Sequence, residues 1–269
     1  IKNMCYLDDS KVVECVILKE KTYNTLCISS QVGCPVDCKF CLTGVVGFKR
    51  QLTVAEIVGQ VLTANADGHL ISNVVFMGMG EPLLNLEEVL KAIHCLTDPN
   101  TLHMSRRKIT VSTSGYLKGI QTLIDRGEAL NLAFSVGSPD PVVREEIMPI
   151  EKRNPIVEVV ALLKTYLTQH NRKLTLEYTL LAGKNDRALD IRGLGNLSLY
   201  LNAKINLINL NPHGKIPYKP VSQNALHKIK AQLKAKGLPV TVRYKKGQDI
   251  TAACGQLGES IIKKKGTAS

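Results

Sequence analysis

Residues 34–41 read Cys34-Pro-Val-Asp-Cys38-Lys-Phe-Cys41, which places three cysteines at the spacing CxxxCxxC. The next cysteine along the chain is Cys95, so no fourth thiol lies close by in the sequence. A structural zinc ion usually takes four Cys or His ligands, and a [4Fe–4S] cluster is normally held by four thiolates. Three thiolates therefore predict a cluster with one iron open to a ligand. The alternatives are a zinc site completed by Cys27 and ordinary buried cysteines.

Strands and helices alternate along the chain on both sides of this loop. Predicted strands cover 12–18, 25–30, 72–77, 108–112, 131–135, 174–180, 205–210 and 240–243. Predicted helices cover 54–64, 86–96, 117–126, 156–170, 188–201 and 223–236. Thr53 and Glu56 form a capping box before the first helix. This alternation is typical of βαβ units, so we expect an α/β fold with a parallel sheet in a partial (β/α)6-type barrel.

The unusual residues follow the predicted strands. They are Cys34 and the segments 78–81, 112–115, 135–138 and 211–212. In barrels of this kind the chemistry takes place at the carboxyl ends of the strands. We therefore expect these segments to form one site.

The composition limits the class of protein and of partner. The net charge is +12 in 269 residues, with basic clusters at 49–50, 106–108, 245–246 and 263–265. This balance fits a polyanion such as nucleic acid, or else only serves solubility. No apolar run could span a bilayer and no signal peptide is present, so a cytoplasmic protein is expected. Eight cysteines in such a protein indicate metal or redox chemistry rather than a disulfide framework. Cys95 lies on the apolar face of a predicted helix and is expected in the core.

Two further stretches carry candidate chemistry. Phe76-Met-Gly-Met-Gly-Glu81-Pro-Leu-Leu-Asn85 follows a strand, its glycines allow a ligand close to the backbone, and Glu81 can accept from an ammonium group. The alternative is a strand-to-helix turn with a capping Asn. Near the C-terminus, Asp249-Ile-Thr-Ala-Ala-Cys254-Gly-Gln-Leu contains an isolated cysteine. Together with Cys27, which lies between strand and loop, it suggests thiol chemistry during turnover.

The cysteine motif, with Phe40 before its last cysteine, resembles the radical S-adenosylmethionine (SAM) superfamily. In combination with GMGEPLLN, VSTSG and DITAACGQL it resembles the RlmN/Cfr family of radical SAM adenosine methyltransferases, from about Cys5 to Leu257. The resemblance implies a radical SAM partial barrel. It divides the chain into an N-terminal β extension (1–24), the core barrel with its catalytic-cysteine loop (25–258) and a basic tail (259–269).

The resemblance also implies cofactors and partners. The cofactors are SAM and a [4Fe–4S] cluster held by Cys34, Cys38 and Cys41. The substrate is an adenosine of 23S rRNA, and possibly of tRNA, methylated at C2 in RlmN and at C8 in Cfr. Pro82 favours C2, whereas residues 96–100 look Cfr-like. We also expect an electron donor such as flavodoxin or ferredoxin. The protein is expected to be a monomer that does not bind a membrane.

Residue roles carry over by position. Cys254 accepts a methyl group, Cys27 resolves the adduct with the base by forming a disulfide, and Glu14 takes the proton of the ring carbon. The implied SAM contacts are Gly80, Glu81, Ser112, Ser135, Val136, Gly137 and Asn211.

The chain departs from the family in two places. The family's Ser-Leu-His segment reads Ser135-Val136-Gly137 here, so only backbone contact is expected from its last residue. The N-terminal helical accessory domain has no counterpart, so the chain is expected either to be truncated or to bind RNA through its basic clusters. A non-catalytic, metal-containing RNA-binding protein is the alternative from another class.

Overall fold

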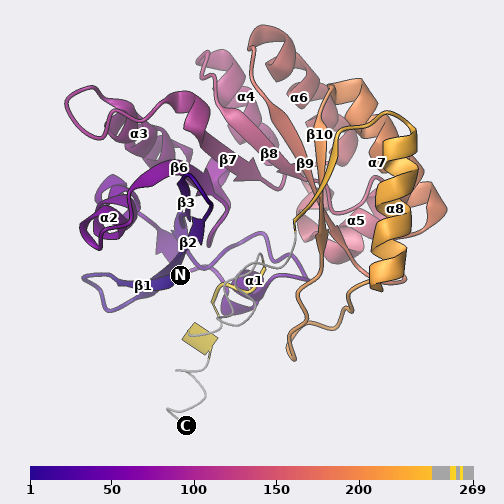
Figure 1. The fold of residues 1–269 in the computed structure, drawn as a ribbon, viewed down its shortest axis with the longest axis horizontal. Coiled ribbons are helices and arrows are strands. Elements are labelled where there is room, and N and C mark those ends of the chain that lie inside the picture. Colours follow the sequence, from indigo (N-terminus) through magenta and orange to yellow (C-terminus); the bar gives the residue numbers. More distant parts are fainter. Residues whose placement is uncertain (244–254, 259–260, 263–269) are drawn as a thin grey trace. The chain divides into compact units, whose positions relative to one another are not determined.

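The computed structural model describes residues 1–243, 255–258 and 261–262. The chain divides into two compact units (Figure 1). Unit 1 consists of residues 1–37, 41–112 and the described residues from 255 onward, and unit 2 consists of residues 38–40 and 113–243 among those described.

The strands of unit 1 follow the order β1-β2-β3-β6-β7. They are β1 (Lys2–Tyr6), β2 (Val12–Lys19), β3 (Asn24–Cys27), β6 (Ile71–Phe76) and β7 (Ile109–Thr113). The pairs β1–β2 and β2–β3 are antiparallel, and β3–β6 and β6–β7 are parallel. The N-terminal hairpin thus extends the edge of a parallel sheet.

Helices α2 (Val54–Ala66) and α3 (Leu86–Thr97) pack against each other in this unit. Thr53 caps α2 with the predicted capping box, since its side chain accepts from the Glu56 amide and the Glu56 side chain accepts from the Thr53 amide. Shorter elements are α1 (Leu42–Val46), the pair β4 (Gln31–Val32) and β5 (Arg50–Gln51), and the 3₁₀ turns η1 (Pro82–Asn85) and η2 (Arg106–Lys108).

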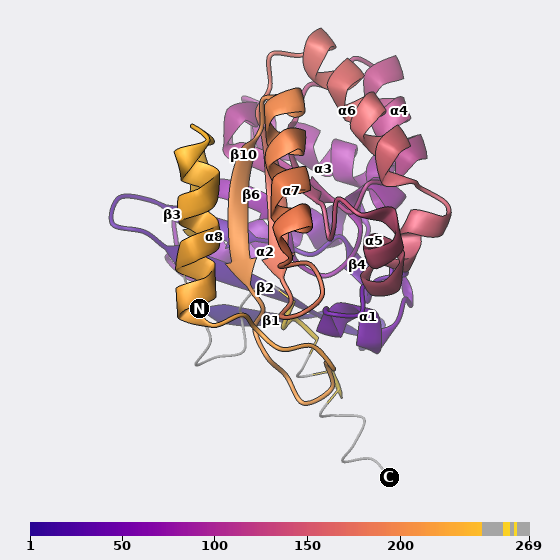
Figure 2. The ribbon, with the colours of Figure 1, turned by 90° about the vertical axis from the view of Figure 1, so that its right-hand side faces the viewer.

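Unit 2 contains four parallel strands in the order β8-β9-β10-β11. They are β8 (Asn131–Ser135), β9 (Leu174–Leu180), β10 (Lys204–Asn209) and β11 (Val240–Arg243). Helix α6 (Ile156–Gln169) contacts both α4 (Leu117–Asp125) and α7 (Ala188–Leu201), and α7 contacts α8 (Gln223–Ala235), which gives a row of helices beside β10 (Figure 2). The short α5 (Pro141–Ile147) and η3 (Pro149–Lys152) follow β8.

Most elements confirm the sequence prediction, and three points need correction. The predicted strand 25–30 ends at Cys27, and α1 and α5 were not predicted. Cys95 was expected in the core of the protein, but its side chain is exposed, because the buried stripe of α3 runs through Val89, Ile93 and Leu96 instead. The division into extension, barrel and tail stays a prediction.

Candidate cofactor and catalytic site

Residues on both sides of the cysteine loop belong to unit 1. Gly33, directly before Cys34, has a φ of 78°, and a Cβ there would collide with the carbonyl oxygen of Gly47. Only glycine allows this close approach of the segment after α1. Cys41 is the residue before α1, which begins at Leu42. The two outer cysteines are thus fixed by the turn and the helix that enclose the loop.

The three cysteines are half-buried and form no disulfide among the described residues. Burial raises the pKa of the Cys34 thiol to about 12, so its thiolate needs a nearby positive charge such as iron. Within the described ranges, no three His, Cys, Asp or Glu side chains lie close enough to bind one metal ion. A cubane binds each thiolate through a different iron, so its ligands need not meet at one point. The donor set therefore fits the predicted cluster.

The Gly-rich segment after β6 lies against the segment after β3, with no room for side chains. A Cβ on Gly78 would lie 2.6 Å from the Ile28 carbonyl oxygen, and one on Gly80 would lie 2.8 Å from Ser30 Oγ. Gly80 also has a φ of 109°, which favours glycine. The Ser30 amide donates to the Met79 carbonyl at 2.9 Å. The backbone of this segment is therefore held in place, and its two glycines have no side chain that could block a ligand.

Polar groups in this segment suit a bound cofactor. The Glu81 amide donates to Gln31 Oε1 at 2.8 Å, and Glu81 Oε1 accepts from the Leu83 amide, which holds a carboxylate that is only 4% exposed. The buried Ser30 Oγ has no hydrogen-bond partner among the described residues. Because a buried hydroxyl is rarely left unpaired, Ser30 indicates that a ligand group binds here. These residues fit SAM.

In unit 2, Arg144 holds two of the predicted segments together. This fully buried side chain of α5 donates from Nε to the Val136 carbonyl at 2.8 Å and from Nη2 to the Ser114 carbonyl at 2.6 Å, and it pairs with Glu151. Burial lowers the pKa of Arg144, and the negative charges of Glu151 and Cys38 oppose this shift. Sequence reasoning missed Arg144, because an arginine in a charged helix does not reveal its burial.

The remaining predicted SAM contacts also follow strands. Gly137 has a φ of 69°, a Cβ there would collide with Met148 Sδ, and its carbonyl accepts from Asn185 Nδ2 at 2.7 Å. Ser112 is half-buried near the end of β7, and Asn211 is buried just after β10. In each unit the predicted contacts thus lie at the carboxyl ends of the parallel strands.

Glu14 is more deeply buried than Cys27, the other predicted catalytic residue in the described part of the chain. Its side chain is 0% exposed, Lys2 Nζ lies 3.0 Å from Oε1, and the Gly258 amide donates to Oε2 at 2.8 Å. Oε1 accepts no hydrogen bond within the described part of the chain, so the Lys2 contact is an ion pair. Since Val16 pairs with Cys27 in the antiparallel register, Glu14 and Cys27 project from the same face of the sheet.

The described part of the C-terminal loop binds to this region of unit 1. The Leu42 amide donates to the Gly255 carbonyl at 2.8 Å, and Thr43 Oγ1 donates to the Leu257 carbonyl at 2.9 Å. Cys254 itself lies outside the described residues. The residues directly after it are thus attached to the helix that follows Cys41 and, through Gly258, to Glu14.

Two cysteines outside the predicted site lie close together. Cys5 Sγ and Cys15 Sγ are 3.7 Å apart on β1 and β2, and both are free. No disulfide forms among the described residues, and neither thiol has a predicted role.

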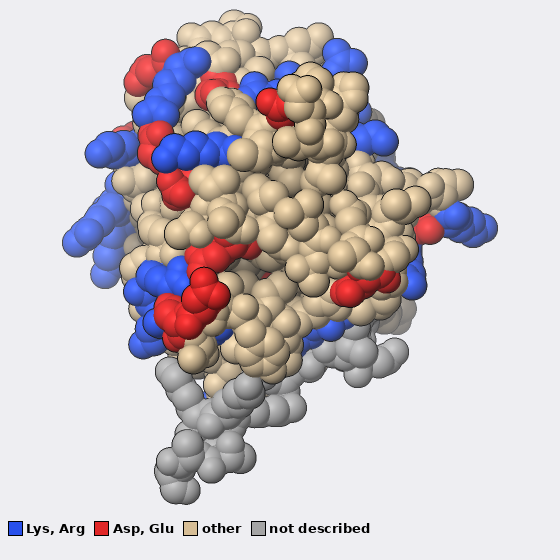
Figure 3. Space-filling model, turned by 90° about the vertical axis from the view of Figure 1, so that its left-hand side faces the viewer, with Lys and Arg blue, Asp and Glu red and all other residues tan. Residues whose placement is uncertain are grey.

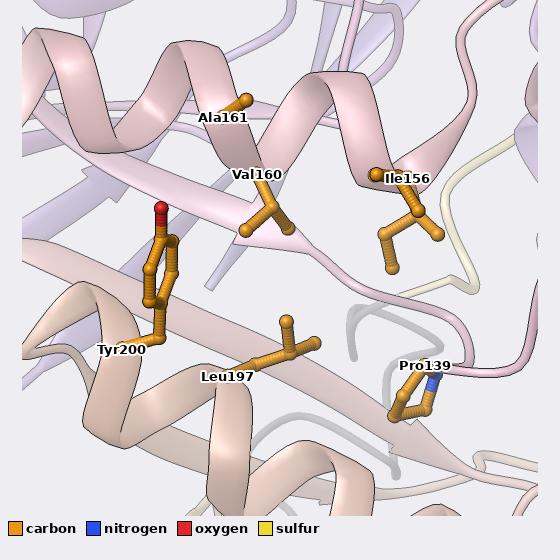
Figure 4. A pocket seen from close by; sticks show the side chains of 7 residues that line it. Pro139, Ile156, Val160, Ala161, Leu197 and Tyr200 are labelled. Atoms are coloured by element: carbon orange, nitrogen blue, oxygen red, sulfur yellow. The ribbon is translucent and has the colours of Figure 1, made fainter.

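A separate cavity of about 320 Å³ lies between α6 and α7 in unit 2 (Figure 4). Its lining is apolar apart from the Tyr200 hydroxyl. The lining residues are Pro139, Ile156, Val157, Val160, Ala161, Leu197 and Tyr200. None is a predicted site residue, and no titratable group except Tyr200 could serve catalysis, so this cavity is not the candidate site.

The basic clusters are less available than the sequence suggests. Arg50 donates to Asp9 and to Glu56, each at 2.7 Å, so it is not an open ligand for phosphate. Basic and acidic side chains lie next to one another on the face drawn in Figure 3. Arg107 and Lys108 are exposed on η2, while the clusters 245–246 and 263–265 lie outside the described residues. No helix in the described ranges is long and apolar enough to cross a membrane.

Comparison with known proteins identifies the superfamily. The sequence pattern of the radical SAM superfamily matches residues 28–192. The crystal structure of a radical SAM methyltransferase from Sphaerobacter thermophilus superposes with a TM-score of 0.91 at 37% identity, covering 95% of this chain and 76% of that one. The predicted radical SAM fold, mixed α/β with a parallel sheet, is confirmed, and so are its cofactors, a [4Fe–4S] cluster and SAM.

Curated relatives narrow the family. The chain is 43% identical over 263 residues to the dual-specificity RNA methyltransferase RlmN of Solidesulfovibrio magneticus, covering 96% of this chain and 75% of that protein. It is 41% identical to the probable dual-specificity RNA methyltransferase RlmN of Thermus thermophilus, covering 97% and 75%. The chain therefore belongs to the RlmN-type RNA methyltransferases of the radical SAM superfamily.

Proposed function

We propose that the chain methylates C2 of an adenosine in 23S rRNA, and of an adenosine in some tRNAs, through a methyl group carried on Cys254. The proposal is supported most strongly by the attachment of residues 255–258. Gly258 donates to Glu14, and Leu42, directly after Cys41, donates to Gly255. The segment that follows Cys254 is therefore bound both to the proposed proton acceptor and beside a proposed cluster ligand.

Each residue then has a defined task. When bound, the cluster and SAM supply the methyl group and the radical that activates it. The Cys254 thiolate accepts the methyl group and later carries the carbon that joins the adenine. Glu14 takes the proton of the ring carbon. Loss of this proton and of one electron, for which the oxidised cluster would be the acceptor, gives a closed-shell thioether between Cys254 and the base. The Cys27 thiolate then attacks the Cys254 sulfur, so a disulfide forms, the electron pair of the sulfur–carbon bond passes to the carbon, the carbon takes a proton, and the methylated base leaves.

The surroundings of Glu14 suit a proton acceptor. Lys2 and the Gly258 amide contact its two carboxylate oxygens and hold it on the sheet face that also bears Cys27. Gln would keep the shape of this side chain but could not accept the proton.

The methylated carbon is proposed as C2 on the strength of Pro82 in the GEPLLN segment and of the relatives named RlmN. Methylation of C8 is the alternative, on the same residues. We also propose a flavodoxin- or ferredoxin-type electron donor, a monomeric state and a cytoplasmic location, which stay predictions.

The experiment is mass spectrometry of RNA after turnover. The protein, reconstituted anaerobically with iron and sulfide, is incubated with SAM, a reductant and either a 23S rRNA fragment or tRNA. The proposal predicts 2-methyladenosine with wild type and none with Cys254→Ala or Glu14→Gln. A product methylated at C8 would support the alternative, and unmethylated RNA with a fully loaded cluster would contradict the proposed function.

A further inference from the structure

The hydroxyl group of Ser29 joins two parts of the candidate site in unit 1. Ser29 lies two residues after the end of β3 and is 0% exposed. Its Oγ donates to the backbone carbonyl of Glu14 at 2.7 Å and accepts from the amide of Met79 at 2.9 Å. Glu14 is the proposed proton acceptor. Met79 directly precedes Gly80 and Glu81, two proposed SAM contacts. One buried hydroxyl thus links the strand of the proposed base to the segment proposed to bind the cofactor.

Strand pairing accounts for the contact between Ser29 and Glu14. In the antiparallel register of β2 and β3, Val16 pairs with Cys27. Each step forward along one strand of such a pair corresponds to one step back along the other, so the same register, if continued, places Ser29 opposite Glu14. The regular strand β3 ends at Cys27, and the side chain of Ser29 continues the contact with β2.

The side chain of Gln60 holds the backbone of Ser29. The Ser29 amide donates to Gln60 Oε1 at 2.8 Å, and Gln60 Nε2 donates to the Ser29 carbonyl at 2.9 Å. Gln60 belongs to α2 and is 2% exposed. A side-chain amide can satisfy both backbone groups of a buried residue in the way that a neighbouring strand does. Because its backbone is held in this way, Ser29 presents its hydroxyl from a fixed position.

The Gly-rich segment leaves room for this hydroxyl. A Cβ on Gly78 would lie 2.7 Å from Ser29 Oγ, so a side chain there would push the two segments apart. Met79 is 0% exposed. A hydroxyl has one donor and two acceptor sites, so it can bond the Glu14 carbonyl and the Met79 amide together. Removing it deprives both buried backbone groups of this partner, which is costly.

We propose that Ser29 is a positioning residue that fixes Glu14 relative to the segment 79–81. Ser29 acts through its bonds to the Glu14 carbonyl and the Met79 amide and is not itself a catalytic residue. The proposal rests on the proposed function, which makes Glu14 the proton acceptor and the segment 79–81 part of the SAM site. The single hydroxyl then determines how well proton removal is aligned with the bound cofactor.

The test compares Ser29→Ala with a matched control, Ser198→Ala. Ser198 lies on α7 in unit 2 and is 2% exposed, and its Oγ donates to the Ala203 carbonyl at 2.6 Å. Both variants lose a buried hydroxyl that donates to a backbone carbonyl, so both should unfold at a lower urea concentration than the wild type. Only the Ser29 hydroxyl is bonded to Glu14 and Met79.

Two measurements on the reconstituted protein separate positioning from stability. The first is the affinity for SAM, titrated without RNA. The second is the amount of SAM consumed for each adenosine methylated, counted at whichever carbon carries the methyl group. We expect Ser29→Ala to bind SAM about fivefold more weakly. It should also consume about threefold more SAM per methylated adenosine, because a displaced Glu14 fails to complete the transfer. Ser198→Ala should keep both wild-type values.

Gln60→Met is a second variant that keeps the Ser29 hydroxyl. It removes both bonds from Gln60 to the Ser29 backbone, so we expect smaller changes of both quantities in the same direction. If Ser29→Ala does not fold, Gln60→Met decides the proposal. The SAM consumed per methylated adenosine is a ratio over active molecules, so a smaller folded fraction does not alter it.

A purely structural role would give a different result. Wild-type SAM affinity and wild-type SAM consumption in Ser29→Ala, with only the unfolding midpoint lowered as in Ser198→Ala, would overturn the proposal. A change in just one of the two quantities would also overturn it, because the hydroxyl would then not connect the two segments. If the wild type methylates no RNA, the proposed function has failed, and the SAM titration alone decides whether Ser29 positions the segment 79–81.

Discussion

The Gly258 amide donates a 2.8 Å hydrogen bond to Glu14 Oε2, although 244 residues separate the two in the sequence. Glu14 lies on β2 in the N-terminal hairpin region, and Gly258 lies four residues after Cys254. The bond therefore joins the proposed base to the loop that carries the proposed methyl acceptor. Within unit 1, this bond brings a residue from the N-terminal part of the sequence together with one from its C-terminal part.

Gly258→Ala should weaken this link. Gly258 has a φ of 106°, and a Cβ there would lie 2.7 Å from Val46 Cγ2, so alanine is both strained and obstructed. We expect methylation to fall by about tenfold or more while SAM binding is retained, because a misplacement of reacting groups by about 1 Å can cost a hundredfold. Single-turnover kinetics and SAM titration measure the two effects.

Gly68→Ala is the matched control for this change. Gly68 also has a positive φ, of 81°, but a Cβ there would meet open space. It should therefore share the backbone strain without the activity loss. Equal activity losses in the two variants would show that the contact of the loop with α1 and Glu14 is irrelevant.

Lys2→Met should destabilise the protein by leaving the Glu14 carboxylate without its cation. The two side chains are 9% and 0% exposed, and breaking one partner of a buried pair costs about 3 kcal/mol or more. Urea unfolding measures the change. Adding Glu14→Gln to Lys2→Met should recover much of the loss.

Lys11→Met supplies the comparison, because Lys11 pairs with Asp9 at the surface. Its unfolding free energy should change by less than about 1 kcal/mol. A Lys2→Met variant as stable as Lys11→Met would show that the Glu14–Lys2 pair does not hold the proposed base.

Arg144→Gln should affect both stability and SAM binding. It removes donors to the Ser114 and Val136 carbonyls and leaves Glu151 without its buried partner, which predicts a loss of about 3–5 kcal/mol. Because Val136 is a proposed SAM contact, SAM affinity should fall as well. Arg192→Gln changes an exposed arginine of α7 and should leave both the unfolding free energy and the SAM affinity close to those of the wild type. If SAM affinity survived in Arg144→Gln, the Val136 carbonyl would not depend on this contact.

The stability difference between Glu177→Gln and wild type should depend on pH. Burial raises the pKa of Glu177 in the folded state, so over the window from about 4.3, the ordinary glutamate value, up to the folded-state pKa the native protein binds more protons than the unfolded chain. The contribution of Glu177 to the free energy of unfolding of the wild type therefore falls as pH rises through this window. Melting temperatures at pH 4 and pH 7 should show Glu177→Gln gaining relative to wild type at the higher pH. A constant difference would contradict the assignment of a buried carboxylate.

The long, periodic elements could be predicted from the sequence, whereas short ones could not. The prediction for β9 matches its bounds, and those for α6 and α7 match within one residue, because their patterns extend over several turns or alternations. Helix α5 has only seven residues, and its start at Asp140 and Pro141 was overlooked. Such a helix has too few turns for periodicity to appear.

The site divides in the same way. Cys34, Glu81 and Gly137 belong to local motifs whose spacing is visible in one stretch of sequence. Arg144 derives its importance from the Ser114 and Val136 carbonyls, which folding brings beside it, and no local pattern shows this. The apolar pattern of α3 predicted that Cys95 is part of the core. In the structure the neighbouring Leu96 is buried and Cys95 is exposed.

The role of Cys254 as carrier of the transferred carbon is tested most directly by denaturing gel electrophoresis of Cys27→Ala and Cys254→Ala after turnover with labelled RNA. Removing Cys27, which is buried at the end of β3, should leave the early steps intact but block resolution of the adduct. We predict that Cys27→Ala accumulates protein joined to RNA, that peptide mapping places the bond at Cys254, and that Cys254→Ala gives none. Normal release of methylated RNA by Cys27→Ala, or a crosslink in Cys254→Ala, would contradict this account.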